Sequence, residues 1–324
     1  MVRCPICRAK SYKKFTKTNI FGKYHFYKCK KCNLLFVGNL PTKKNLSIFY
    51  SKYFSLPKNQ NLKNLKKFSF VFDKINISTE RCSKLKFLDI GSGNGEIASF
   101  LLNKNIGKIV CVDFSEDLLK IKKKIKSKKL KIIIGDFLNI ENKLKDNYFD
   151  IVTLFDVVEH LVNPKIYLSL AIKKLKSRGK LIITTPNINS LNYLIYKKYW
   201  DWISPPWHLF YFSPDSISYL MRKLGMYKIQ IYSFYGDWEE SLIFSLIKLP
   251  FEIIKYSLKI LILYFLNNYI FSLSEKKVKK LNISTKTYSI DKFYSSIQKM
   301  LKKIDRLFYS ELTYPHLLVI CEKK

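Results

Sequence analysis

Apolar and polar positions follow one another along the middle of the chain in segments typical of alternating strands and helices. Apolar runs of strand length predict buried strands at 85–90, 109–113, 131–134, 149–155 and 180–185. Between them, helical patterns cover residues 96–103, 117–126 and 164–175, and Asn163 and Pro164 supply an N-cap and a first-turn proline for the last of these. This order predicts an α/β fold, with helices on both faces of a parallel sheet.

The flanking parts of the chain have other patterns, and they suggest four regions. Residues 1–40 are typical of a small hairpin module, and residues 41–83 of a helical connector. The alternating region extends over 84–236 and is completed by a final strand within 307–324, while residues 237–306 form an apolar helical insertion. Charged residues interrupt the apolar stretch 241–273, so we expect a lid over the site or an amphipathic membrane-surface patch, not a spanning helix.

The composition changes this picture little. The net charge is +35, but only 6 of the 59 basic residues are arginine, the side chain that phosphate-binding surfaces favour. Compositional bias therefore explains the abundant lysine, whose side chains we expect on solvated surfaces. A nucleic-acid partner is the less favoured interpretation. The chain opens with "MVRCPICRAK", in which no secretory leader is visible, so we expect a cytoplasmic protein, with attachment to a membrane surface through 241–273 as the alternative.

Four of the seven cysteines form two C-x-x-C pairs, Cys4 with Cys7 and Cys29 with Cys32. Four thiolates from two such knuckles can surround one Zn²⁺ tetrahedrally, at Zn–S distances of about 2.3 Å. A module of this size has too small a core to fold without a staple, which favours a structural zinc in a ribbon-like module. Iron or a redox dithiol is the alternative at these positions.

The stretch "LDIGSGNGEIASFLL" follows the first predicted strand and opens a helix. Gly91, Gly93 and Gly95 permit a tight turn that a ligand can approach closely. A dinucleotide fingerprint requires a small third residue, whereas Glu96 stands there and would repel a pyrophosphate. The pattern D-x-G-x-G-x-G from Asp89 resembles motif I of the class I S-adenosylmethionine-dependent methyltransferases, whose cofactor is cationic and tolerates nearby carboxylates.

Further polar and aromatic residues come at the ends of the next predicted strands. Asp113 could accept hydrogen bonds from both ribose hydroxyls of such a cofactor. Asp136 could accept from its adenine amino group, and Phe137 could cover the ring. Phe155 ends the fourth strand at the pocket mouth. Capping and core packing are the competing roles for these side chains.

The later motifs strengthen the resemblance to class I methyltransferases. They read "VVEHL", "GKLIITTPN" and "PPWHLFYFSPDSI", and the likeness covers residues 84–235 and the last strand. It implies a Rossmann-like seven-stranded sheet with an antiparallel last strand. It also implies that S-adenosyl-L-methionine contacts Asp89, Gly91, Gly93, Gly95, Asp113, Asp136 and Phe137. Some members that methylate nucleotide-linked sugars begin with a cysteine-rich zinc module.

The acceptor is less constrained by the sequence. His160 after the fourth strand and His208 in an aromatic segment could each act as a general base or orient the acceptor, or could be structural. We expect a small-molecule acceptor, foremost a nucleotide- or lipid-linked sugar or another glycan-biosynthesis intermediate, methylated on oxygen or carbon. An RNA methyltransferase that grips phosphates with its ribbon and basic surface, or a non-catalytic docking module, are the alternatives.

Overall fold

The computed structural model describes residues 2–19, 21–42, 46, 64–75, 82–115, 118–119, 125, 127–234 and 314–324. The predicted apolar insertion at 237–306 lies outside the described residues, as do most of the connector and most of the helix expected at 117–126. Within the part of the chain that is described, no helix is long and apolar enough to cross a membrane.

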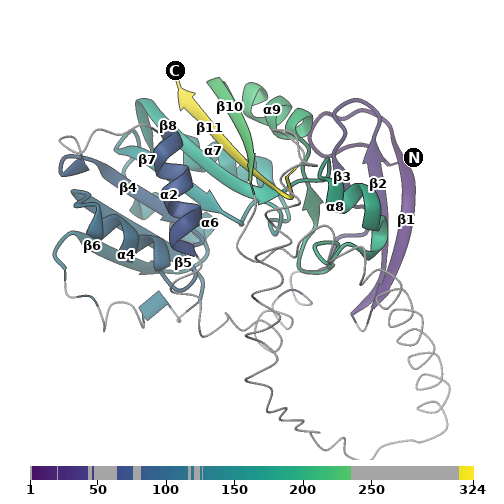
Figure 1. Ribbon diagram of the computed structural model, residues 1–324, viewed down its shortest axis with the longest axis horizontal. Helices are drawn as coiled ribbons and strands as arrows, with labels where there is room; N and C mark the ends of the chain where they lie inside the picture. Colours follow the sequence, from purple (N-terminus) through teal and green to yellow (C-terminus); the bar gives the residue numbers. More distant parts are fainter. Residues whose placement is uncertain are drawn as a thin grey trace, which may run out of the picture.

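A seven-stranded sheet forms the centre of the molecule, in the order β10-β11-β8-β7-β4-β5-β6 (Figure 1). The strands are β4 (Lys86–Ile90), β5 (Lys108–Asp113), β6 (Leu130–Ile134), β7 (Phe149–Phe155), β8 (Leu175–Pro186), β10 (Met226–Phe234) and β11 (His316–Lys323). The five from β4 to β8 are parallel, and β11 runs antiparallel to both of its neighbours. The predicted Rossmann-like sheet with an antiparallel last strand is therefore confirmed.

Strand positions agree with the hydrophobic pattern to within a residue or two, except at the start of β8. That strand was expected from residue 180 but begins at Leu175, directly after the preceding helix. Its first residue pairs with Phe149 before the register shifts and regular pairing with β7 resumes. The extra residues include charged side chains, so the apolar pattern could not mark them as strand.

Helices cover both faces of the sheet. On one face lie α2 (Asn64–Ile75) and α4 (Glu96–Asn103), and on the other lie α7 (Pro164–Lys174), α9 (Pro214–Lys223) and the short α6 (Phe137–Ile140). Alternate residues of each strand enter the two cores: Phe87 joins the α2–α4 side, while Leu88 and Ile90 join the other. The single-turn η1 (Glu141–Lys143) follows α6. The predicted caps are present, since the Asn163 side chain accepts from the backbone N–H of Ile166.

The N-terminal residues form a second, four-stranded antiparallel sheet in the order β1-β2-β3-β9. Its strands are β1 (Ser11–Asn19), β2 (Gly22–Cys29), β3 (Leu35–Val37) and β9 (Phe210–Tyr211), so antiparallel hairpin pairing is present within residues 1–40, as expected. The last strand comes from the central part of the chain and follows α8 (Leu191–Tyr196) and η2 (Lys197–Tyr199). The N-terminal module is thus joined by strand pairing to β9, a segment of the central region outside the larger sheet, and the division into four regions stays a prediction.

Candidate functional site

The glycine loop connects β4 to α4 in a conformation that needs its glycines. Gly91, Gly93 and Gly95 all have positive φ, at 76°, 53° and 71°. A Cβ atom on Gly91 would lie only 2.4 Å from a methyl carbon of Val157. The loop is held to β5, because the N–H of Gly91 donates to the carbonyl of Val112 at 2.8 Å. A left-handed backbone and a close neighbour together exclude larger residues here.

Two buried carboxylates support this loop. Asp113, the last residue of β5, accepts from the N–H of Gly93 at 2.7 Å and from the N–H of Ser115 at 2.8 Å. Asp89 accepts from the Thr153 hydroxyl at 2.6 Å, and burial raises its pKa to about 6. The structure therefore places both predicted acids beside the glycine loop, whereas their contacts with a cofactor stay a prediction.

The two residues after β6 have local partners. Asp136 caps α6 by accepting from the N–H of Leu138, and it also accepts from the Tyr167 hydroxyl. Phe137 is buried in the core, with its ring 6.1 Å from that of Tyr167. Both residues lie where a strand end was expected, but these contacts are the capping and packing roles that the sequence left open. Their assignment to adenine stays a prediction.

The end of β7 meets a helix that sequence patterns did not connect with the site. The Phe155 ring packs 5.6 Å from that of Phe68 on α2. The next residue, Asp156, has a positive φ of 54° and forms an ion pair with Lys67, also on α2. The Thr184 hydroxyl donates to the other oxygen of Asp156 at 2.7 Å. No motif marks Lys67 in the sequence.

Glu159, His160 and His208 come together although 48 residues separate the two histidines. Their ligand-type atoms all lie within 4.8 Å of one another. The backbone holds the group together, because the N–H groups of Leu209 and Phe210 both donate to the carbonyl of Glu159. A carboxylate with two imidazoles is a donor set that divalent cations accept.

Hydrogen bonds define the tautomer of both imidazoles, that is, which ring nitrogen carries the proton. Nδ1 of His160 lies 2.9 Å from the carbonyl of Trp207, and Nδ1 of His208 lies 2.7 Å from that of Trp202. A carbonyl only accepts, so both Nδ1 atoms carry the proton and both Nε2 atoms have a lone pair. Burial lowers the pKa of His160 to about 4 and that of His208 well below its usual value. Both side chains are therefore neutral at physiological pH.

Aromatic rings surround the histidines. The Trp202 ring stacks on that of His208 at 5.3 Å, and the indole N–H of Trp207 donates to Nε2 of His160 at 3.3 Å. We call the segment from Trp200 to Phe212 the aromatic wall. It packs on the N-terminal hairpin, where Phe26 lies in one core cluster with Trp200 and Tyr211. The aromatic wall is thus supported on one side by the N-terminal module.

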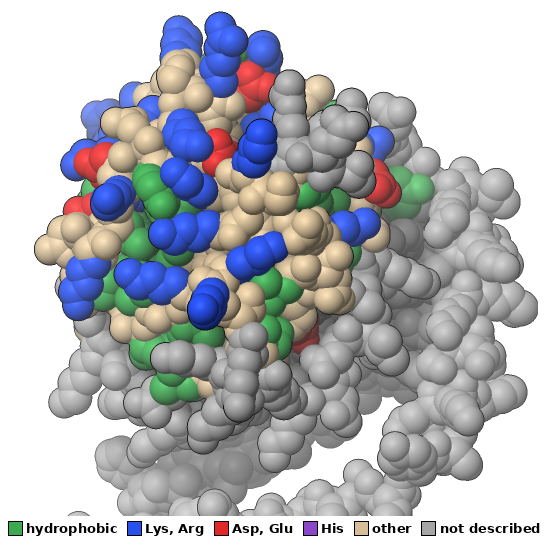
Figure 2. Space-filling view, turned by 90° about the vertical axis from the view of Figure 1, so that its left-hand side faces the viewer, with side chains coloured by type: hydrophobic (Ala, Val, Ile, Leu, Met, Phe, Trp, Pro, Cys, Tyr) green, Lys and Arg blue, Asp and Glu red, His purple; other side chains and the backbone are tan. Residues whose placement is uncertain are grey.

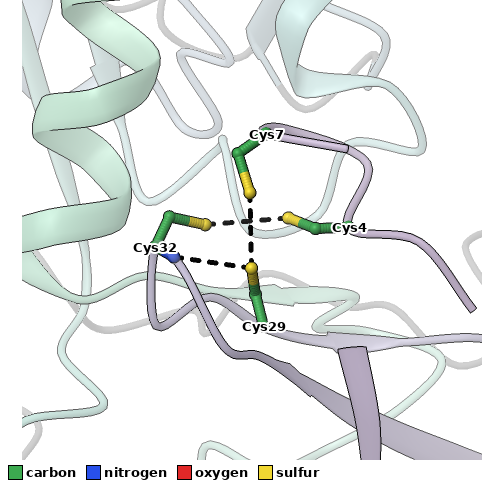
Figure 3. Close-up of side chains that lie close together, drawn as sticks. All are labelled: Cys4, Cys7, Cys29 and Cys32. Carbon is green, nitrogen blue, oxygen red and sulfur yellow. Dashed lines mark hydrogen bonds between the residues drawn. The ribbon is translucent and has the colours of Figure 1, made fainter. Parts of the chain in front are cut away.

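The four cysteines of the two C-x-x-C pairs converge, as Figure 3 shows. The Sγ atoms of Cys4 and Cys32 are 3.7 Å apart, and those of Cys7 and Cys29 are 3.3 Å apart. Four sulfurs at about 2.3 Å from a central zinc ion would lie about 3.8 Å from one another. All four thiols are buried, and the backbone N–H groups of Lys31 and Cys32 point at the sulfur of Cys29. The donor set fits a closed tetrahedral zinc site.

Comparisons with known proteins agree with this architecture. The ubiquinone biosynthesis O-methyltransferase of Dictyostelium discoideum is 28% identical over 148 residues, which cover 39% of this chain and 45% of that protein. The enzyme of the same name from Candida albicans is 35% identical over 109 residues, or 32% of this chain and 33% of that protein. The chain thus spans between a third and a half of the length of these two curated relatives.

A chain from the complex between the Haloferax volcanii Trm112 methyltransferase activator and a methyltransferase has a similar fold. It is 13% identical with a TM-score of 0.50, and the match covers 82% of this chain and 91% of that one. The family model described as "Methyltransferase domain" matches residues 58–231, which is more than half of the chain. The chain therefore belongs to this methyltransferase-domain family and has the Rossmann-like fold of the class I S-adenosylmethionine-dependent methyltransferases.

Proposed function

We propose that the protein binds S-adenosyl-L-methionine at the glycine loop and transfers its methyl group to an oxygen atom of a small molecule. The observation that carries this proposal is the bond from the Gly93 N–H to Asp113, which fixes a buried carboxylate at the end of β5 beside the loop. Ligands of open α/β sheets bind at this edge, where the strand order reverses. Here the reversal falls between β4 and β7.

The strand order suggests how the cofactor lies. Asp136 follows β6, Asp113 ends β5, and the glycine loop follows β4, and these three strands are consecutive neighbours. With adenine near Asp136 and ribose at Asp113, the methionyl part extends over β4 toward β7. The sulfonium then faces the group formed by Glu159, His160 and His208 after β7. Transfer from a sulfonium requires mainly that donor and acceptor are held in line.

Methylation of a hydroxyl also requires that its proton is accepted. A neutral imidazole can accept a proton through the lone pair of Nε2, and at His160 an acceptor hydroxyl would replace the 3.3 Å bond from the Trp207 indole N–H. His160 is also the partly exposed member of the pair, while His208 is buried. We assign His160 to contact the acceptor and His208 to support it. The neighbouring Trp202 and Trp207 supply flat apolar surface, which suits a phenol ring or a sugar face.

Two acceptor chemistries are compatible with this assignment. The names of the relatives point to an oxygen atom of a ubiquinone precursor, while the zinc-ribbon-like N-terminus points to a nucleotide- or lipid-linked sugar. Both are small molecules with a hydroxyl group. A peripheral contact of residues 241–273 with a membrane would bring lipid-linked acceptors close, and this contact and a cytoplasmic location stay predictions.

We further propose that Cys4, Cys7, Cys29 and Cys32 hold a structural zinc ion. When bound, the ion would cross-link the first knuckle to the end of β2 and the turn between β2 and β3, and it would offer no open coordination position for catalysis.

RNA is less favoured as the acceptor. The three lysines whose ammonium groups surround the Tyr148 ring, Lys86, Lys108 and Lys145, lie toward the amino ends of the strands, opposite the glycine loop. Figure 2 shows basic side chains scattered over one face of the molecule.

Calorimetric titration with S-adenosyl-L-methionine, with NADH in parallel, tests the cofactor assignment. Micromolar binding of the first alone is expected, and binding of NADH alone or of neither would refute the proposal. Transfer of a labelled methyl group is then measured with a catechol-type phenol, a nucleotide sugar and a transcribed RNA. Label in either small molecule supports the proposal, and label only in the RNA contradicts it.

A further inference from the structure

The end of β1 lies against the aromatic wall, and we call its residues 17–19 the hairpin tip. The Lys17 ammonium donates to the backbone carbonyl of Ile203, and the Asn19 side-chain amide donates to the carbonyl of Pro205. In each of these bonds, 186 residues separate the donor from its acceptor. The hairpin tip therefore links the N-terminal module to the wall at a second point, apart from the pairing of β3 with β9.

This part of the wall has few backbone donors of its own. Pro205 and Pro206 have no N–H group, so two successive residues donate no backbone hydrogen bond. Both prolines are buried, and carbonyl groups in a buried segment need donors. Lys17 and Asn19 supply donors to the carbonyls that precede and follow that of Ser204. The hairpin tip thus fixes the direction of the peptide groups around Ser204.

The carbonyl of Ser204 in turn orients the residues that contact the histidines. It accepts from the N–H of Trp207 at 2.9 Å and from the N–H of His208 at 3.2 Å. The carbonyl of Trp207 then accepts from Nδ1 of His160 at 2.9 Å. The carbonyl of Trp202, on the other side of Ser204, accepts from Nδ1 of His208 at 2.7 Å. A chain of backbone groups therefore connects the hairpin tip to the proton-bearing nitrogens of both histidines.

We propose that Lys17 and Asn19 are positioning residues that hold the two histidines of the site in the tautomer with its lone pair on Nε2. This inference rests on the proposed function, in which His160 receives the proton of the acceptor hydroxyl. The bond made by one imidazole nitrogen determines which nitrogen carries the proton. When the segment around Ser204 moves, its neighbouring carbonyls no longer lie opposite Nδ1, and the proton can occupy Nε2 instead. A protonated Nε2 of a neutral ring cannot accept the hydroxyl proton, so the N-terminal module controls methyl transfer through the backbone of the wall.

Two asparagines of the N-terminal module allow a matched test. Asn19 accepts from the N–H of Phe21 at 2.9 Å through Oδ1 and donates to the wall through Nδ2. Asn39 accepts from the N–H of His25 at 2.7 Å and donates to the carbonyl of Lys23 at 2.7 Å, so both of these partners lie within the module. Asn19→Asp and Asn39→Asp each keep the accepting oxygen and the side-chain shape but lose the amide donor. Of the two lost bonds, only that of Asn19 reaches the wall.

Long-range proton–nitrogen NMR spectra of protein labelled at the histidine nitrogens report the tautomers directly and need no acceptor. The chain has four histidines, and His160→Gln and His208→Gln identify the two sets of signals by their loss. The wild type should show a protonated Nδ1 in both rings. Asn19→Asp, alone or combined with Lys17→Met, should move the proton toward Nε2 in at least one ring, whereas Asn39→Asp should not.

The second measurement is methyl transfer to the acceptor that the wild type labels, either a catechol-type phenol or a nucleotide sugar. General-base catalysis contributes about 10²–10⁴-fold, so the double variant Asn19→Asp/Lys17→Met should lose about 10- to 100-fold in kcat. Binding of S-adenosyl-L-methionine should stay nearly unchanged. Lys17→Arg in place of Lys17→Met restores one donor and should recover part of the lost rate.

Melting curves verify that each variant is folded, and if Asn19→Asp is not, Lys17→Met against Lys17→Arg makes the same comparison. An unchanged protonated Nδ1 in both rings of the folded variants overturns the inference and leaves the proposed function intact. Equal changes in Asn19→Asp and Asn39→Asp overturn it as well. A wild type that labels neither small molecule refutes the proposed function, while the tautomers of the variants still decide the positioning role.

Discussion

The tight approach of Gly91 to Val157 permits a quantitative test of the glycine loop. In Gly91→Ala, the new methyl group meets two separate obstacles. The residue has a φ of 76°, and a side chain in the left-handed region costs about 1–2 kcal/mol. The added Cβ would also lie 2.4 Å from a Val157 methyl carbon, and such overpacking costs about 1–3 kcal/mol. The variant should therefore lose about 2–5 kcal/mol of unfolding free energy.

The two costs can be separated by a double-mutant cycle. Val157→Ala removes the overlapping methyl groups and by itself should cost about 1 kcal/mol, because Val157 is only half-buried. In the double variant the steric overlap is gone but the backbone strain stays. The double variant should therefore be more stable than the sum of the single variants predicts, by about 1–3 kcal/mol.

Urea unfolding of the four proteins, followed by circular dichroism, measures this coupling. Gly225→Ala is the matched control, because Gly225 has a φ of 81° with no atom within 4 Å of a new Cβ, so only the backbone strain applies there. It should cost about 1–2 kcal/mol and show no coupling to Val157→Ala. Additive effects within about 0.5 kcal/mol for Gly91→Ala and Val157→Ala would refute the steric explanation.

Three further changes test other parts of the site. Asp113→Asn should weaken S-adenosyl-L-methionine binding about 10-fold or more, since charge-assisted bonds are lost, and unchanged affinity by calorimetry would contradict the ribose assignment. Burial raises the pKa of Asp89 from 3.8 to about 6, so the folded state binds a proton on this carboxyl more tightly than the unfolded state does. The contribution of Asp89 to the free energy of unfolding therefore falls as pH rises from about 4 to about 6, by at most about 3 kcal/mol. The stability of Asp89→Asn relative to wild type, from urea midpoints, should therefore be higher at pH 7.5 than at pH 4.5, and a pH-independent difference argues against a buried, proton-retaining Asp89. Cys29→Ser should release zinc and leave cofactor affinity nearly unchanged. It should also shift the tryptophan emission of the aromatic wall, because the wall packs on the N-terminal hairpin. The control Cys82→Ser should keep its zinc, and full zinc content in Cys29→Ser would disprove the ligand assignment.

The sequence by itself determined the features that depend on neighbours along the chain. Strands and helices of the large sheet follow from the period of apolar residues, because each element buries one face or stripe. The glycine loop follows from the spacing of Gly91, Gly93 and Gly95 directly after a buried strand. The two C-x-x-C pairs indicate a metal site for the same reason, since two sulfurs three residues apart already form half of a tetrahedron.

The tertiary structure alone decided which distant residues meet. Lys67 and Asp156 are 89 residues apart, and no pattern in the connector distinguishes that lysine from its many neighbours. The pairing of β3 with β9, which supports the aromatic wall, joins segments that are far apart and only two or three residues long. The tautomers of His160 and His208 depend on carbonyl groups that the folded wall presents. Such contacts arise from the packing of whole elements, and local periodicity carries no information about them.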